Sequence, residues 1–215
     1  EWFNNDTPWW ELRNRPSVTL DEFKKFKNLA KLPAAVSPSM TTAQTIKNRS
    51  NVLENMVIEG TDEEYINTTN LNFESGRYFS GVESNAGRNV IVLGSELALE
   101  LFPNDNALNS VVKVRGHRFK VIGVLEKQGS WVLGNFNPDN KAYIPITAMM
   151  KYFVNDSWES ITINVRAPNS AMVPAVRDEA QGVMRRIRGL KYNQTDDFSI
   201  NQQEGLMSTI NSTMD

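Results

Sequence analysis

Hydrophobic residues recur at helical spacing in two segments, one near each end of the chain. In the first, Thr19 and Glu22 form a capping box ahead of apolar residues spaced three and four apart, which predicts an amphipathic helix over residues 20–31. In the second, Asn169 or Ser170 caps a helix with an apolar stripe. The stripe consists of Val173, Val176, Ala180, Val183, Ile187 and Leu190.

Between these helices the pattern changes to that of β-strands. Short and β-branched residues flank a turn at residues 48–51, which predicts a strand on each side of it. Thr61, followed by three acidic residues, is the expected N-cap of a short helix. Strict alternation over residues 160–166 predicts a strand with one buried face, and residues 196–200 predict a last strand.

The middle of the chain predicts a strand, a tight turn and a helix, followed by a hairpin. Residues 90–93 are continuously apolar, and Ser95 is the expected N-cap of a helix that ends at Phe102. Two β-rich runs flank Gly116 and His117, so the histidine is expected at an exposed turn tip, where we assign it no role. Pro145 predicts that residues 142–146 form an edge strand.

Composition and charge narrow the class of protein. The 215 residues are 40 % hydrophobic and 22 % charged, so the chain can bury a core. The formal net charge of -2 argues against a nucleic-acid binder. Arg185, Arg186 and Arg188 fall in the last turns of the second helix, where we expect them to complement the helix dipole and stay solvated.

The scarcity of cysteine and histidine excludes several kinds of active site. With no cysteine and one histidine, disulfides, thiol nucleophiles, zinc sites and Ser-His-Asp triads are hard to build, and we expect no cofactor or metal. We interpret the acidic residues 62–64 as a helix N-terminus, and Asp196 and Asp197 as a strand entry, rather than as acid/base groups. Neither a phosphate-binding glycine loop nor a nucleophile elbow of the form G-x-S-x-G occurs.

Three ordered stretches in the middle of the chain carry a resemblance to a known family. They are SGRYFS at residues 75–80, RNVIVLGSELALELF at residues 88–102 and FKVIGVL at residues 119–125. In this order and spacing they resemble the MacB-like periplasmic core domain, the extracytoplasmic insert of FtsX-type (MacB- and LolC/E-like) ABC transporter permeases. The sequence departs from the family at residues 106–109, where a P-I-G turn is usual.

The resemblance implies an α+β fold with a discontinuous domain. A porter-like βαβ subdomain is expected from residues 1–69 and 157–215, and a smaller mixed α/β, Sabre-like subdomain from the inserted residues 70–156. Five positions match residues that stabilise the fold in the family. They are Gly76, Arg77, Gly94, Phe102 and Gly123. We expect Arg77 to act as a structural lock, because the arginine fork can make a bidentate hydrogen bond to a neighbouring segment.

The function that the resemblance implies is mechanical and non-catalytic. Such domains face the periplasm on the bacterial inner membrane and receive motion from their own transmembrane helices and a cytoplasmic ATPase domain or subunit. Implied partners include a membrane-fusion protein and an outer-membrane duct, with a homo- or heterodimeric full-length protein and no nucleic acid. Because no run of about 18 apolar residues occurs and the chain starts without methionine, we expect a segment of a longer membrane protein.

One loop is a candidate contact for a partner. Residues 128–140 are rich in glycine, proline and asparagine, yet they include large apolar side chains that either bind a partner or cap a core. These side chains are Trp131, Val132, Leu133 and Phe136. Two other functions stay open at this point: a standalone extracytoplasmic binding module, and a small hydrolase with this loop as a lid.

Overall fold

The structure is a computed structural model that describes residues 16–49, 51–128, 137–154 and 160–201. Its internal contacts divide the chain into two compact units. One unit combines Glu1–Leu32 with Ala167–Asp215, and the other is Pro33–Arg166. We describe each unit by itself. The predicted porter-like and Sabre-like boundaries stay a prediction.

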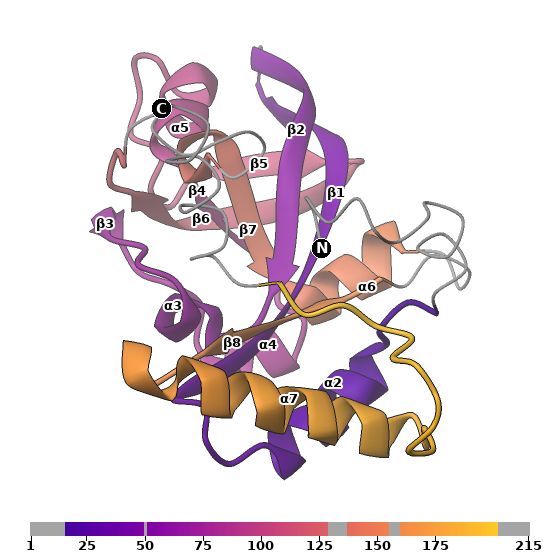
Figure 1. The fold of residues 1–215 in the computed structure, drawn as a ribbon. Coiled ribbons are helices and arrows are strands. Elements are labelled where there is room, and N and C mark those ends of the chain that lie inside the picture. The colour runs from indigo at the N-terminus through magenta and orange to yellow at the C-terminus, as the bar shows by residue number, and fades with distance from the viewer. Residues whose placement is uncertain (1–15, 50, 129–136, 155–159, 202–215) are drawn as a thin grey trace, which may run out of the picture. The chain divides into compact units, whose positions relative to one another are not determined.

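An eight-stranded mixed sheet forms the larger unit (Figure 1). Its strands are β1 Ala35–Asn48, β2 Asn51–Thr61, β3 Phe73–Gly76, β4 Val90–Leu93, β5 Val111–Val114, β6 His117–Leu125, β7 Lys141–Pro145 and β8 Thr162–Arg166. The strand order is β2-β7-β4-β6-β5-β1-β8, and β3 pairs with β6. The strands predicted on both sides of residues 48–51, at residues 90–93 and within residues 160–166 are confirmed.

Six of these strands close into a ring. The series β1, β2, β7, β4, β6 and β5 is hydrogen-bonded from each strand to the next, and β5 pairs back to β1. Closure depends on the length of β1, because residues 35–39 of this strand pair with β8 and residues 46–47 pair with β5. A closed ring leaves few unpaired strand edges, so the pairing stabilises the sheet on both sides of each member.

Apolar side chains are buried on both faces of β4. Alternate residues of a strand point to opposite faces, and in β4 Ile91 and Leu93 belong to one face while Val90 and Val92 belong to the other. The second face carries an aromatic cluster of Tyr65, Tyr78, Phe79, Val90, Val92, Ile122, Leu125 and Tyr143. Continuous apolar runs are typical of strands buried on both faces, as the sequence of β4 predicts.

Short helices join the strands of the larger unit. They are α3 Tyr65–Thr68, α4 Gly81–Asn85, α5 Ser95–Leu101, the 3-10 turn η2 Pro138–Asn140 and α6 Ile146–Phe153. The predicted caps Thr61 and Ser95 are wrong. The Thr61 hydroxyl donates to the Pro38 carbonyl at 2.8 Å inside the sheet. Gly94 is the N-cap of α5, and Ser95 is its first residue.

The edge position predicted for residues 142–146 is also wrong. Strand β7 lies inside the sheet, parallel to β2 and antiparallel to β4. Proline is tolerated because Pro145 is the last residue of the strand, immediately before α6 begins at Ile146. A missing amide donor matters little at a strand end, where the ladder stops.

The predicted hairpin is confirmed, but the place of its histidine is not. Strands β5 and β6 pair antiparallel, and the turn consists of Arg115 and Gly116, whose φ angles are 48° and 87°. Two consecutive positive φ angles are typical of a tight hairpin turn. His117 is the first residue of β6, is half-buried and stacks on the Tyr152 ring at a centroid distance of 4.1 Å.

Two helices form the described part of the smaller unit. Helix α2, Leu20–Leu29, has the predicted capping box between Thr19 and Glu22. Asn169 accepts a hydrogen bond from the Met172 amide ahead of η3 Ser170–Met172 and α7 Val173–Ile187. Of the predicted apolar stripe on α7, Val176 is buried and the rest are half-buried, while the buried Met184 was not predicted.

The C-terminal end of this unit differs from prediction. Residues 196–200 form no strand, because Asp196 and Asp197 bind arginines of the preceding helix end. Arg188 is not solvated, since its side chain is 5 % exposed and its guanidinium pairs with Glu22 at 3.1 Å and with Asp197 at 3.0 Å. The pair of Glu22 and Arg188 joins residues 166 positions apart, and Asp196 and Asp197 lie beyond the helix, so helix periodicity alone could not predict these pairs.

Candidate functional site

The four side chains of the predicted partner-contact loop, Trp131, Val132, Leu133 and Phe136, lie outside the described residues. The residues that flank the loop are well fixed. The Gln128 amide donates to Asp139 Oδ1 at 2.9 Å, and the Gln128 side chain donates to the Asn70 carbonyl at 2.9 Å. Asp139 is 1 % exposed. The base of the loop is therefore anchored in the larger unit.

Arg77 makes a bidentate pair with Glu83, six residues further along the chain. Arg77 Nη1 lies 2.7 Å from Glu83 Oε2, and Nη2 lies 2.9 Å from Oε1. The same carboxylate accepts from the Ser80 amide in the capping box of α4. The Arg77 guanidinium, with these hydrogen bonds, lowers the pKa of Glu83 to about 2. Arg77 thus fixes the segment between β3 and α4, and its role as a lock on a neighbouring part stays a prediction.

A buried ion pair joins β2 and β7. Lys141 Nζ lies 3.3 Å from Glu59 Oε2, with side chains 10 % and 7 % exposed. The Tyr65 hydroxyl of α3 donates to Glu59 Oε1 at 2.9 Å. The parallel register sets Val57 beside Lys141 and Glu59 beside Tyr143, so these residues share one face of the sheet. Burial is tolerated because each oxygen of the carboxylate has a partner.

Three buried tyrosines surround this ion pair. Burial, followed by the nearby negative charge of Glu59, raises the pKa of Tyr65 and of Tyr143. Burial also raises the pKa of Tyr78 far above its usual range. The phenols therefore stay protonated at neutral pH, and the Tyr65 hydroxyl donates its proton to Glu59 in a hydrogen bond. The Tyr78 hydroxyl is buried without a hydrogen-bond partner in the described part of the chain.

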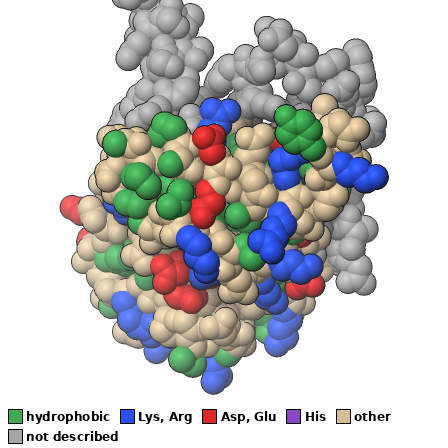
Figure 2. Space-filling model, turned by 60° about the horizontal axis from the view of Figure 1, so that its bottom comes forward, with side chains coloured by type: hydrophobic (Ala, Val, Ile, Leu, Met, Phe, Trp, Pro, Cys, Tyr) green, Lys and Arg blue, Asp and Glu red, His purple; other side chains and the backbone are tan. Residues whose placement is uncertain are grey.

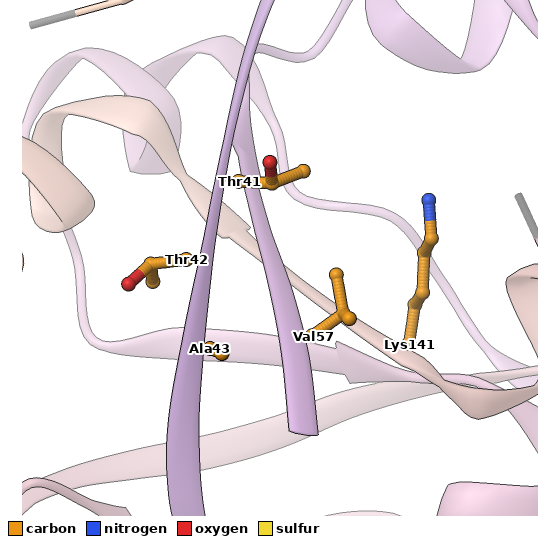
Figure 3. Close-up of a pocket in the computed structure, with 5 residues that line it drawn as sticks. All are labelled: Thr41, Thr42, Ala43, Val57 and Lys141. Carbon is orange, nitrogen blue, oxygen red and sulfur yellow. The ribbon is translucent and has the colours of Figure 1, made fainter. Parts of the chain in front are cut away.

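A hollow of about 200 Å³ opens beside the ion pair (Figure 3). Its lining residues are Thr41, Thr42, Ala43, Val57 and Lys141. In Figure 3 the Thr41, Val57 and Lys141 side chains lie on one side of the β1 ribbon and Thr42 lies on the other. Pockets for small ligands are typically 300–1,000 Å³. The Lys141 ammonium is already paired with Glu59. The hollow is smaller than this range, and Lys141 is the only ionisable side chain among its five lining residues.

The ion pair of Glu59 and Lys141 was not predicted from the sequence. The two residues are 82 positions apart. The alternation of Val57 and Glu59 in a predicted strand places them on one face, but nothing local indicates that β7 pairs with β2. Only the sheet order brings the lysine to the carboxylate.

The described residues contain neither a metal-binding cluster nor a membrane-spanning helix. No group of three or more His, Cys, Asp or Glu side chains is arranged to hold a metal ion there. The longest helix in the described ranges is α7 with 15 residues, and none of these helices has the length and apolar character needed to cross a bilayer. Figure 2 shows a face on which acidic, basic and apolar side chains are interspersed.

Comparison with known proteins identifies the family. The sequence model of the MacB-like periplasmic core domain matches residues 3–183. The chain belongs to this family. It is 29 % identical over 203 residues to the macrolide export ATP-binding/permease protein MacB of Bdellovibrio bacteriovorus, covering 93 % of the chain and 30 % of that protein. It is 27 % identical to the uncharacterised ABC transporter permease YknZ of Bacillus subtilis, covering 73 % of the chain and 40 % of YknZ.

Solved structures of this family share the fold. The periplasmic region of MacB from Actinobacillus actinomycetemcomitans aligns with a TM-score of 0.76 and 17 % identity, covering 95 % of this chain and 89 % of that one. The extracellular domain of YknZ aligns with a TM-score of 0.67 and 20 % identity, covering 83 % and 88 %. The predicted resemblance to the MacB-like periplasmic core domain and the predicted α+β fold are confirmed. The chain spans less than half of the curated relatives that it matches.

Proposed function

We propose that this MacB-like periplasmic core domain passes ATP-driven motion of a permease to extracytoplasmic partners or cargo, without catalysing a reaction itself. The observation that supports the proposal is the family match over residues 3–183. The relatives in that family are ATP-binding/permease proteins and an ABC transporter permease. The chain itself supplies no phosphate-binding glycine loop, so hydrolysis of ATP belongs to a cytoplasmic domain or subunit.

The closed ring of strands suits a part that transmits force. Every strand of the ring is hydrogen-bonded on both sides, and the strands carry fully buried apolar side chains such as Ile46, Ile58 and Val121. Packed cores have low compressibility and transmit strain rather than absorbing it. A displacement applied at one end of the domain is therefore delivered at the other. The porter-like residues 1–69 and 157–215 and the Sabre-like residues 70–156 are the proposed subdomains, and both contribute strands to the ring.

The partners follow from the same proposal. The domain is joined to its own transmembrane helices in a homo- or heterodimer on the bacterial inner membrane, with this part on the periplasmic side. Macrolide export is named for several relatives, so we infer an efflux class of transport. A membrane-fusion protein and an outer-membrane duct are the further proposed partners in efflux across the outer membrane. The loop with Trp131, Val132, Leu133 and Phe136 is the proposed contact, held at its base by Gln128 and Asp139.

Cysteine accessibility in intact cells tests the placement of the domain. These 215 residues contain no cysteine, so Val82→Cys, in a full-length protein whose remaining cysteines are replaced, supplies one reactive thiol at a position 76 % exposed. We expect a membrane-impermeant maleimide to label it in spheroplasts without lysis. Ala98→Cys, at a position 6 % exposed, is the buried control and is expected to react only after unfolding. Labelling of Val82→Cys only after lysis would contradict an extracytoplasmic position.

A further inference from the structure

The outer face of β1, β5 and β6 carries an unusual concentration of positive charge. Five exposed cations lie on these adjacent strands and their turn: Lys47, Lys113, Arg115, Arg118 and Lys120. The register sets Lys47 opposite Lys113, and Lys113 opposite Arg118. Neighbouring strands lie about 5 Å apart. Three cations therefore form one row across three strands, and Lys120 continues the charge along β6.

These cations have no acidic neighbour to neutralise their charge in the described part of the chain. None of the five has a carboxylate within 4.0 Å there, so no ion pair interrupts the row. Like charges directly opposite each other destabilise a sheet. The chain as a whole has a net charge of -2, so a basic row is not a consequence of composition. The row therefore weakens the isolated fold, and negative charge on a partner would offset that cost.

The form of this surface restricts the kind of partner. Strand β5 is paired on both sides, to β1 and β6, and β6 is paired to β4, so a partner cannot add as an extra strand here. The outward positions of these segments carry no aromatic ring on which a nucleic-acid base would stack. Two exposed valines flank the row, with Val52 opposite Lys47 and Val111 opposite Lys120, and they are 46 % and 38 % exposed.

We propose that the basic face of Lys47, Lys113, Arg115, Arg118 and Lys120 docks an acidic polypeptide surface of a partner protein. Protein interfaces combine apolar contacts with charge and are enriched in arginine, which fits the two valines among the cations. Cations at alternate positions of a strand lie about 7 Å apart, the spacing of carboxylates at alternate positions of an extended acidic segment. Complementary charge of this kind speeds association and fixes the orientation of a partner.

The test uses the 215-residue chain and a fluorescein-labelled oligo-glutamate peptide as the probe. We expect anisotropy to show binding that weakens about tenfold between low and physiological salt, because exposed charges are screened. The triple variant Lys47→Gln, Lys113→Gln and Arg118→Gln is expected to bind at least about tenfold more weakly. It removes the like-charge row, so we expect its thermal unfolding temperature to be no lower than that of the unchanged chain.

A matched control separates this face from net charge. Lys25→Gln, Arg177→Gln and Arg186→Gln remove the same charge from exposed positions on α2 and α7, and we expect less than a twofold effect. Equal weakening by both triple variants would overturn the proposal, as would absence of peptide binding. Binding to phosphatidylglycerol vesicles without binding to the peptide would also overturn it. The assay is independent of transport, so its failure leaves the proposed function standing.

Discussion

Replacing Gly94 with alanine is expected to remove about 3 kcal/mol from the free energy of unfolding. A Cβ atom at this position would lie 2.2 Å from the Pro138 carbonyl oxygen and 2.4 Å from the Asp139 oxygen. Both are backbone atoms, which cannot rotate out of the way as a side chain can. The backbone at Gly94, between β4 and α5, would have to move away from η2, which leads into β7. Denaturant unfolding followed by circular dichroism measures the loss.

A glycine in the same unit provides the control. At Gly81 the nearest atom to an added Cβ is Glu63 Oε1, the end of a flexible side chain, at 3.3 Å. Gly81→Ala is therefore expected to change the free energy of unfolding by no more than about 0.5 kcal/mol. Equal stability of the Gly94→Ala and Gly81→Ala chains would show that the close approach at Gly94 does not exist.

The second large effect is expected at Arg188, in the smaller unit. Its guanidinium pairs with Glu22 and Asp197 and donates to the Pro16 carbonyl at 3.1 Å, with the side chain 5 % exposed. Arg188→Met would leave two partly buried carboxylates without their cation. Breaking a buried pair in this way costs about 3–5 kcal/mol, and the lower end applies because both carboxylates keep some contact with water.

Arg186→Met is the matched control for this experiment. Arg186 is two residues away, exposed, and forms no ion pair within the described residues. We expect its replacement to change stability by less than about 0.5 kcal/mol. The measurement is the unfolding midpoint of both variants in the same denaturant series. Similar midpoints would mean that Arg188 is solvated after all, as helix position alone predicts.

Local sequence patterns predicted where helices and strands occur more accurately than they predicted which residues each element contacts. The Thr19 and Glu22 capping box is confirmed because both hydrogen bonds are made within four residues. Thr61 has the same residue type as a cap, yet its hydroxyl donates to Pro38 in the neighbouring strand. Pro145 suggested an edge strand, but its position at the end of β7 satisfies the same physical requirement inside the sheet. Local patterns cannot choose between such alternatives.

Contacts between charged side chains were even harder to predict from local sequence patterns. Glu59 and Lys141 meet because β2 pairs with β7, and Glu22 and Arg188 meet across 166 positions of sequence. The basic row exists only because β1 pairs with β5, which brings Lys47 beside Lys113. Each of these contacts depends on strand order or helix packing. The ordered family motifs around Gly76, Gly94 and Gly123 identified the fold, but they say nothing about these pairs.

A distance measurement in the full-length permease tests most directly whether ATP-driven motion reaches this domain. A spin label at Leu99→Cys, on α5 at a position 66 % exposed, reports the distance between the two copies in a dimer by pulsed electron resonance. The proposed function predicts that the distance distribution shifts between nucleotide-free and ATP-bound protein. An unchanged distribution in a protein that hydrolyses ATP and transports its cargo would contradict the claim.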